Sequence, residues 1–113
     1  MDEDRKLDAM HAEVCRVFSH PTRIYLLRSL RDRESSVGRL AETMGLSQPT
    51  ISKHLSLMHA RGVLRSRREG TTVFYRAENP KVLEAFDLMR EVMIEQIRAN
   101  RRLLERTRRG RNS

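Results

Sequence analysis

The polar side chains best suited to recognising another molecule lie close together near the middle of the chain. They are those of Ser47, Gln48, Thr50, Ser52, Lys53 and His54, with Pro49 between them. A glutamine amide can pair with an adenine edge through two hydrogen bonds, and hydroxyl groups can bond either bases or phosphates. Lysine supplies positive charge for a phosphate backbone. This chemistry favours a surface that reads double-stranded DNA, although an ordinary capped surface helix would show the same residue types.

A second group of side chains is basic and follows about ten residues later. Its members are Arg65, Arg67, Arg68 and, beyond Gly70 and Thr71, Arg76. Short β-prone runs on both sides of a glycine predict a β-hairpin, in which one of Phe74 and Tyr75 should face the core. Basic residues at the tip of such a hairpin can contact phosphates or enter the minor groove. The hairpin residues expected at a DNA interface are Arg67, Arg68, Gly70 and Thr71.

The groups that catalysis requires are missing from the sequence. It has neither a glycine-rich phosphate loop nor a His-Glu-x-x-His motif. No nucleophile, base and orienting residue form a recognisable set. We therefore expect a protein that is not an enzyme and that needs no cofactor.

A metal site has only one weak candidate. His11 and Cys15 are four residues apart, so they share one face of a predicted helix and could chelate a metal together. The alternative is that Cys15 is a small, half-buried apolar residue and that His11 lies at the helix surface. Because Cys15 is the only cysteine, no disulfide can form within the chain. We predict that the protein has no metal site.

The elements that must position these groups follow from apolar spacing and from capping residues. Apolar residues recur at helical spacing in five segments, and two short β-prone runs stand between the last two of them. The expected helices cover residues 5–18, 21–31, 37–44, 47–61 and 80–106, and the expected strands cover 63–69 and 72–77. The predicted fold is mainly α with a small β-hairpin, in the order α-α-α-α-β-β-α.

The third and fourth predicted helices form a helix-turn-helix pattern. Gly45 ends the first of them as a left-handed C-terminal glycine commonly does, and Ser47 can cap the next, with Pro49 in its first turn. The small side chain of Ala41 lets the two helices approach at a steep angle. The second helix then projects from the body as a recognition helix, and the hairpin directly after it is expected to be a wing.

The last predicted helix carries a long apolar stripe, and the first helix carries a shorter one. We expect both stripes to form a homodimer interface, because a chain of 113 residues buries only a modest core of its own. The expected interface residues are Leu7, Met10, Val14, Val82, Phe86, Met89, Met93 and Ile97. The alternative is that the stripe on the last helix packs inside a monomeric core.

The net charge of +8 is concentrated in two parts of the chain. Residues 21–79 carry 11 basic and 5 acidic side chains, and residues 98–113 carry 7 and 1. This distribution suits contact with a polyanion, although a well-solvated surface would show the same balance. We divide the chain into a DNA-binding and dimerisation domain, residues 1–106, and a basic, disordered tail, residues 107–113.

The hydropathy pattern indicates a cytoplasmic protein. The N-terminal segment is acidic and lacks the apolar run of a secretory signal. No apolar run approaches the roughly 18 residues needed to cross a bilayer. A single cysteine agrees with a reducing compartment.

Three stretches of the chain resemble the ArsR/SmtB family of bacterial repressors. They are Ser19–Leu27, Leu46–Leu55 with its Ser-Gln-Pro-Thr-Ile-Ser-Lys-His-Leu string, and Arg68–Arg76, within a similarity that covers about residues 10–97. The resemblance implies a winged helix-turn-helix homodimer whose first and last helices form the dimer interface. It also implies repression at an inverted repeat near a promoter, with release when an inducer binds.

The metal-sensing members of that family use ligands that this chain lacks. Such members carry a Cys-x-Cys-type motif where this chain has residues 34–39, a stretch without any thiol. A second family site uses histidines on the last helix, but no histidine follows His59 here. The sequence therefore names no inducer. A winged-helix module for nucleic-acid or protein association, without a regulated operator, is the alternative function.

Overall fold

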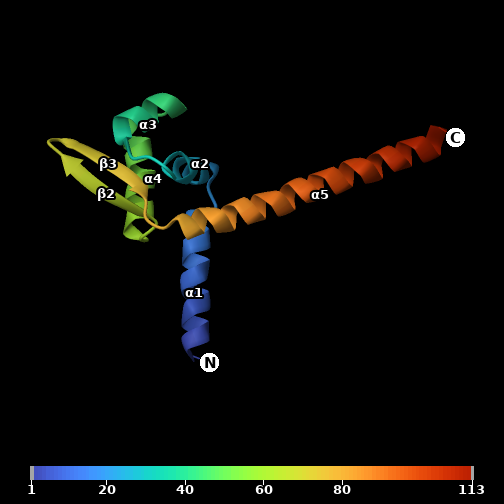
Figure 1. The fold of residues 1–113 in the computed structure, drawn as a ribbon, viewed down its shortest axis with the longest axis horizontal. Coiled ribbons are helices and arrows are strands. Elements are labelled where there is room, and N and C mark those ends of the chain that lie inside the picture. Colours follow the sequence, from blue (N-terminus) through green and yellow to red (C-terminus); the bar gives the residue numbers. More distant parts are fainter. Residues whose placement is uncertain (1, 113) are drawn as a thin grey trace. The chain divides into compact units, whose positions relative to one another are not determined.

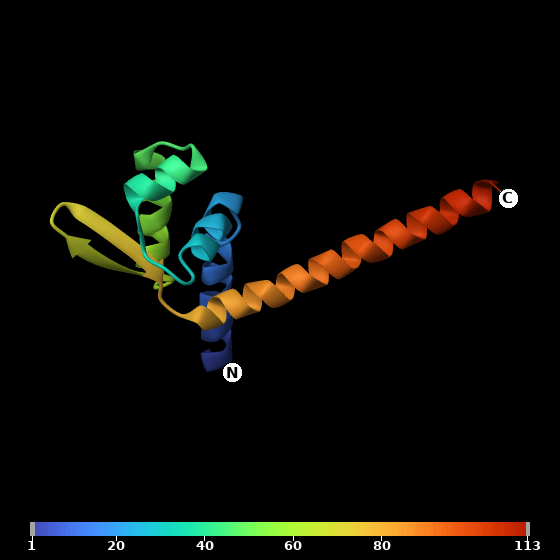
Figure 2. The same cartoon turned by 45° about the horizontal axis from the view of Figure 1, so that its top comes forward.

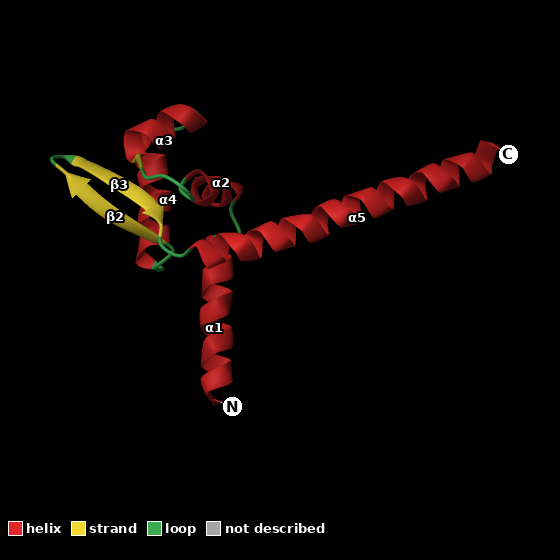
Figure 3. Cartoon of the chain, viewed as in Figure 1, coloured by secondary structure: helices red, strands yellow, loops and turns green. Residues whose placement is uncertain are grey.

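The computed structural model describes residues 2–112, which form five helices and three strands (Figure 1 and Figure 3). In chain order these are α1 (Asp2–Val17), α2 (Pro21–Ser29), β1 (Ser35–Ser36), α3 (Val37–Met44), α4 (Gln48–Ala60), β2 (Leu64–Glu69), β3 (Thr72–Ala77) and α5 (Pro80–Asn112). Contacts divide the chain into two units, one ending at Pro80 and the other beginning at Lys81. The predicted fold class is confirmed, and β1 is an addition to it.

Helix α4 is the centre of the first unit. Helices α2 and α3 and strand β2 pack against it, and α3 lies across its N-terminal end (Figure 2). The side chains of α4 that are fully buried are Ile51, Leu55 and Met58, as the apolar spacing predicted. Neighbouring elements contribute Leu26, Leu27, Leu30, Leu40 and Ala41 to the same core. Burying each large apolar side chain stabilises the fold by about 1.5–3 kcal/mol. Burial of these side chains therefore fixes α4 to the rest of the first unit.

Local capping sets the starts of helices α2, α3 and α4. Ser47 accepts a hydrogen bond from the N–H of Thr50 at 3.3 Å, which starts α4 where the sequence predicted it. His20 caps α2 through Nδ1, which accepts from the N–H of Thr22 at 3.2 Å. Ser36 caps α3 in the same way as Ser47 caps α4. Helices α2, α3 and α4 therefore each follow a residue whose side chain satisfies an otherwise unpaired N–H.

The three strands form one antiparallel sheet in the order β1-β3-β2. In the hairpin Glu69 pairs with Thr72, so Gly70 and Thr71 form the two-residue turn that the sequence predicted. Gly70 has a φ of 62°, as the first position of a type II′ turn requires. The pairing of β1 with β3 was not expected, because a two-residue strand is too short to show a strand pattern in the sequence.

The hairpin has two unlike faces, since successive side chains of a strand point to opposite sides. The inner face, toward α4, carries Leu64, Ser66, Arg68, Val73, Tyr75 and Ala77. The outer face carries Arg65, Arg67, Glu69, Thr72, Phe74 and Arg76. Leu64 and Ala77 are buried, and Ser66 Oγ lies 3.2 Å from Nε2 of His59 on α4.

Neither aromatic residue of β3 enters the core. Tyr75 is on the inner face, where its ring meets the ring of His59 edge-on at 6.1 Å, but it stays half-buried. Phe74 is also half-buried and lies beneath the guanidinium of Arg67. One of the two aromatic residues was predicted to face the core, and Tyr75 does so without being buried, because the buried positions on this face are at the base of the hairpin.

Helix α5 is longer than the sequence predicted. It continues past residue 106 to Asn112, whereas residues 107–113 were expected to form a disordered tail. Arginine, leucine and glutamate are good helix formers, and a single glycine such as Gly110 costs a helix only about 1 kcal/mol. Ser113 lies outside the described residues. Within residues 2–112 no helix has the length and apolar character needed to cross a membrane.

Candidate DNA interface

The turn between α3 and α4 closes as the sequence predicted. Gly45 has a φ of 66°, in the left-handed region, and ends α3. The N–H of Leu46 donates to the carbonyl of Ala41 at 3.0 Å, which satisfies a terminal carbonyl of α3. The chain therefore reverses within a few residues, and the first turn of α4 is left exposed at the surface.

The polar residues of α4 divide between two sides of the helix. Each residue turns about 100° around the helix axis, so Ser52 lies about 200° from both Thr50 and His54. Gln48 and Ser52 are on the side of the wing, Thr50 and His54 are on the other side, and Lys53 lies between them, about 100° from both Ser52 and His54. The hydroxyls of Ser47 and Thr50 are 2.7 Å apart and bond each other. The predicted site residues of α4 therefore do not form one cluster.

A groove lies between the first turns of α3 and α4 and the tip of the wing. It is lined by Ser36, Val37, Gly38, Gln48, Pro49, Ser52, Thr71, Thr72 and Val73. A Cβ at Gly38 would lie 3.6 Å from Nε2 of Gln48, so the amide of Gln48 lies over the first turn of α3. Hydroxyls and an amide beside two helix N-termini can donate hydrogen bonds to phosphates and base edges. The groove brings Gln48, Pro49, Ser52 and Thr71 together from the predicted set.

His54 lies away from this groove and packs against α2. Its ring centroid is 4.7 Å from that of His20, and its side chain is half-buried. Burial lowers the pKa of His54, and the neighbouring His20 and Arg23 lower it further. The ring is therefore held in its neutral form, beside the cap of α2. No sequence signal marked this pairing, because the two histidines belong to different helices.

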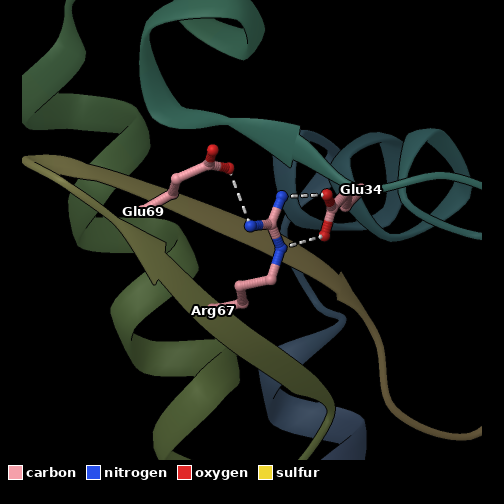
Figure 4. A network of polar contacts seen from close by, with 3 residues as sticks. All are labelled: Glu34, Arg67 and Glu69. Carbon is pink, nitrogen blue, oxygen red and sulfur yellow. Dashed lines mark hydrogen bonds and ion pairs between the residues drawn. The ribbon is translucent and has the colours of Figure 1, made fainter.

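Arg67 is held by acids on the outer face of the wing (Figure 4). Its Nε donates to Oε2 of Glu34 at 3.0 Å, its Nη2 donates to the other oxygen of Glu34, and its Nη1 donates to Oε2 of Glu69 at 2.9 Å. The hydrogen bond from Arg67 holds the pKa of Glu34 below its ordinary value, and the bonds to Glu34 and Glu69 raise the pKa of Arg67. Glu34 was not foreseen, since 33 residues separate it from its partner in the sequence.

The other predicted wing residues stay exposed. Arg68 belongs to the inner face, opposite Val73, and within residues 2–112 no acid is paired with it. Gly70 and Thr71 form the exposed tip, and Thr71 reaches the groove. The two neighbouring arginines therefore differ: Arg68 keeps an unpaired charge, whereas Arg67 does not.

The apolar stripes expected at a dimer interface lie open on their helices. Their most exposed members are Leu7, Met10, Met89, Met93 and Ile97, each between 53 and 64% accessible. Val14, Val82 and Phe86 are half-buried. Large apolar side chains left this open in a row are typical of a surface that another chain covers.

The weak metal candidate gains no further ligand. His11 and Cys15 are both exposed on α1. Among the described residues, no group of three or more histidines, cysteines or acids lies close enough together to hold a metal ion.

Residues 20–66 match the family model described as the bacterial regulatory protein, arsR family. The chain is 47% identical over 70 residues to the HTH-type transcriptional regulator KmtR of Mycobacterium tuberculosis, covering 62% of this chain and 54% of KmtR. It is 32% identical over 92 residues to the uncharacterized HTH-type transcriptional regulator Rv0081 of the same organism, covering 80% and 81% of the two chains. The match spans 54 to 64% of the length of the first curated relatives.

Solved structures show the same fold. The crystal structure of Rv0081 superposes with a TM-score of 0.75 at 29% identity, covering 83% of this chain and 95% of that one. A solution structure from Mycobacterium bovis, described as a homodimeric winged helix-turn-helix DNA-binding domain, gives a TM-score of 0.75 at 28% identity, with 84% and 88% covered. The first unit of this chain is therefore a winged helix-turn-helix, with α3 and α4 as its two helices and β2–β3 as its wing.

Proposed function

The chain belongs to the ArsR family of bacterial regulatory proteins, and from this premise we propose that it is a transcriptional regulator that binds DNA as a homodimer. It acts in the cytoplasm as a repressor, on an inverted-repeat operator. Each protomer inserts α4 into a major groove and lays its wing along the adjoining backbone. The groove between α4 and the wing tip is the observation that carries this assignment.

The chemistry of this groove fits a base edge flanked by a phosphate. The amide of Gln48 stands at the exposed start of α4, where a recognition helix contacts bases. Ser52 follows one turn later on the same side. Thr71 lines the groove at the wing tip, and the exposed Arg68 is paired in the sheet with the lining residue Val73, so both suit the sugar-phosphate backbone. Thr50, on the opposite side of α4, and Lys53, between the two sides, are assigned to the second backbone of the same groove.

A homodimer follows from the open apolar stripes of α1 and α5. A pair of protomers related by twofold symmetry presents two copies of α4, which read two half-sites about 34–36 Å apart. The stripe that includes Met89, Met93 and Ile97 is the proposed contact. An inducer that changes the spacing of the two helices would release the operator, and no resident metal or cofactor is required.

Footprinting of the purified protein on genomic DNA tests the assignment. We expect protection of an inverted repeat whose half-sites are separated by about one helical turn. Gln48→Ala should lower the preference for this operator over unrelated duplex roughly tenfold, because a bidentate contact to a base is lost. Glu42→Gln, an exposed change on α3, is the control and should leave the preference unchanged. Equal binding to every duplex, or to RNA, would instead favour a nucleic-acid module without an operator.

Dimerisation is tested separately on α5. Met93→Glu places a charge on the open stripe and should convert the protein to a monomer in sedimentation measurements. Glu91→Lys lies about 200° away on the same helix and should leave the dimer intact. A protein that sediments as a monomer without any substitution would contradict the dimer.

A further inference from the structure

We propose that Arg67 is a positioning residue, which straps the wing to the helix-turn-helix, and that Arg68 makes the wing's contact with a DNA phosphate. This division of roles rests on the proposed function, to which it adds a separate role for each of the two arginines. Glu34 is the acid that decides which of the two arginines stays available.

The side chain of Arg67 spans the whole outer face of the sheet. It starts on β2, and its Cζ lies 4.6 Å from the ring centroid of Phe74 on the central strand β3. Beyond that ring it meets Glu34, the residue directly before β1 (Figure 4). Strands β1 and β2 are not neighbours in the sheet, so this one side chain ties all three strands together.

The guanidinium of Arg67 is poorly available to a phosphate. All three of its nitrogens already donate to carboxylates, two to Glu34 and one to Glu69. Phe74 covers one face of the group. Arg67 and its two carboxylates carry a net charge of −1, while Arg65 and Arg76, which also act on Glu34, add two positive charges to the same face. An incoming phosphate would therefore have to displace a carboxylate from Arg67, although the face as a whole is not negative.

The strap connects the wing to the helix that precedes the recognition helix. Ser36 is both the second residue of β1 and the cap of α3. Strand β1 contributes only two paired residues to the sheet, so its ladder is short. The ion pair of Glu34 with Arg67 adds a second connection between the wing and the start of α3. The orientation of the wing relative to α3, and thus the width of the groove, depends on this ion pair.

Arg68 has the opposite environment. It lies on the inner face opposite Val73, a residue that lines the groove beside α4. It is exposed, and within the described part of the chain no carboxylate is paired with it. Its charge therefore stands free at the place where the backbone of a bound duplex would pass.

The salt dependence of operator binding separates the two roles. Each phosphate contact contributes about 0.9 to the slope of log Kd against log salt concentration. Because the dimer presents two copies of Arg68, Arg68→Ala should lower this slope by about 1.8, whereas Arg67→Ala should leave it unchanged and weaken binding roughly twofold to tenfold at every salt concentration. Glu34→Gln should raise the slope, because it releases Arg67 to contact a phosphate. Equal losses of slope for both arginine variants, or an unchanged slope for Glu34→Gln, would overturn the strap.

Exchanging the charges tests the pair directly. Arg67→Glu and Glu34→Arg should each weaken operator binding, and the double variant should regain most of the loss because the tie is restored in reverse. A double variant no better than Arg67→Glu would overturn the strap. Both sites are at least 40% exposed, and circular dichroism would verify that each variant folds.

Operator preference tests the proposed function, and the phosphate contacts of the arginine variants test the role of Arg67 separately. A wild-type protein without operator preference would overturn the proposed function. Wild-type binding with the expected preference, combined with a lost phosphate contact in Arg67→Ala, would overturn the strap alone.

Discussion

Helix α4 and the wing both carry polar groups that suit DNA, yet they hold them in different states. On α4, Gln48 and Lys53 are exposed. On the wing, Arg67 is bound by Glu34 and Glu69, whereas its neighbour Arg68 has no acid paired with it within residues 2–112. The type of a side chain thus determines which groups it can bind, whereas its contacts in the folded protein determine whether it is free to bind DNA.

The geometry of each element explains this contrast. A strand sends neighbouring residues to opposite faces, so Arg67 and Arg68 cannot share one environment. A helix separates residues two apart by about 200°, which places Ser52 beside the wing and His54 against His20. In both elements, residues close together in the sequence therefore have different surroundings.

The largest effect is expected where the inner face of the wing packs on the body. Leu64→Ala should lower the free energy of unfolding by about 2–5 kcal/mol, because it empties a buried site at the base of the hairpin. Arg65→Ala, next to it on the outer face, should stay within about 0.5 kcal/mol. Urea denaturation measures both, and equal effects would break the distinction between the two faces.

The turn of the wing should be more sensitive than a helix to the same substitution. Gly70→Ala should destabilise by about 1–2 kcal/mol, because alanine at a φ of 62° is strained. Gly110→Ala, within α5, should instead stabilise the helix by up to about 1 kcal/mol. Thermal unfolding of the two variants gives the sign, and a loss of stability in both would contradict this expectation.

The ion pair between Glu34 and Arg67 on the outer face of the wing should weaken in acid. Arg67 holds the pKa of Glu34 below its ordinary 4.5, so folding favours the carboxylate. Its contribution is complete above pH 4.5 and is lost as the pH falls through the lowered pKa. The stability difference between wild type and Glu34→Gln should therefore shrink in this range. A difference that stays constant from pH 6 to pH 3 would show that the ion pair does not contribute.

The smallest effect is expected on the far side of α4. Burial holds the pKa of His54 below its ordinary 6.5, so folding favours the neutral ring. Above pH 6.5 both folded and unfolded states are neutral, and below it the unfolded chain binds the proton first, so stability falls. His54→Asn should show less loss of stability between pH 7 and pH 5 than wild type. An identical pH profile would place His54 outside this coupling.

The sequence by itself determined the parts of the protein that depend on neighbouring residues. The capping Ser47, the left-handed Gly45 and the turn at Gly70 each act within a few positions, so their residue types predict the structure directly. The buried side of α4 followed from helical spacing. These local signals were enough for the helix order, the wing and the family resemblance.

Only the tertiary structure decided which predicted residues are free to act. The partners of Arg67 and His54 come from distant elements, and β1 exists only because β3 pairs with it. Contacts of this kind depend on how the core places whole elements side by side, and spacing along the chain carries no record of them. For that reason the sequence placed two arginines at one interface, and the fold separated them.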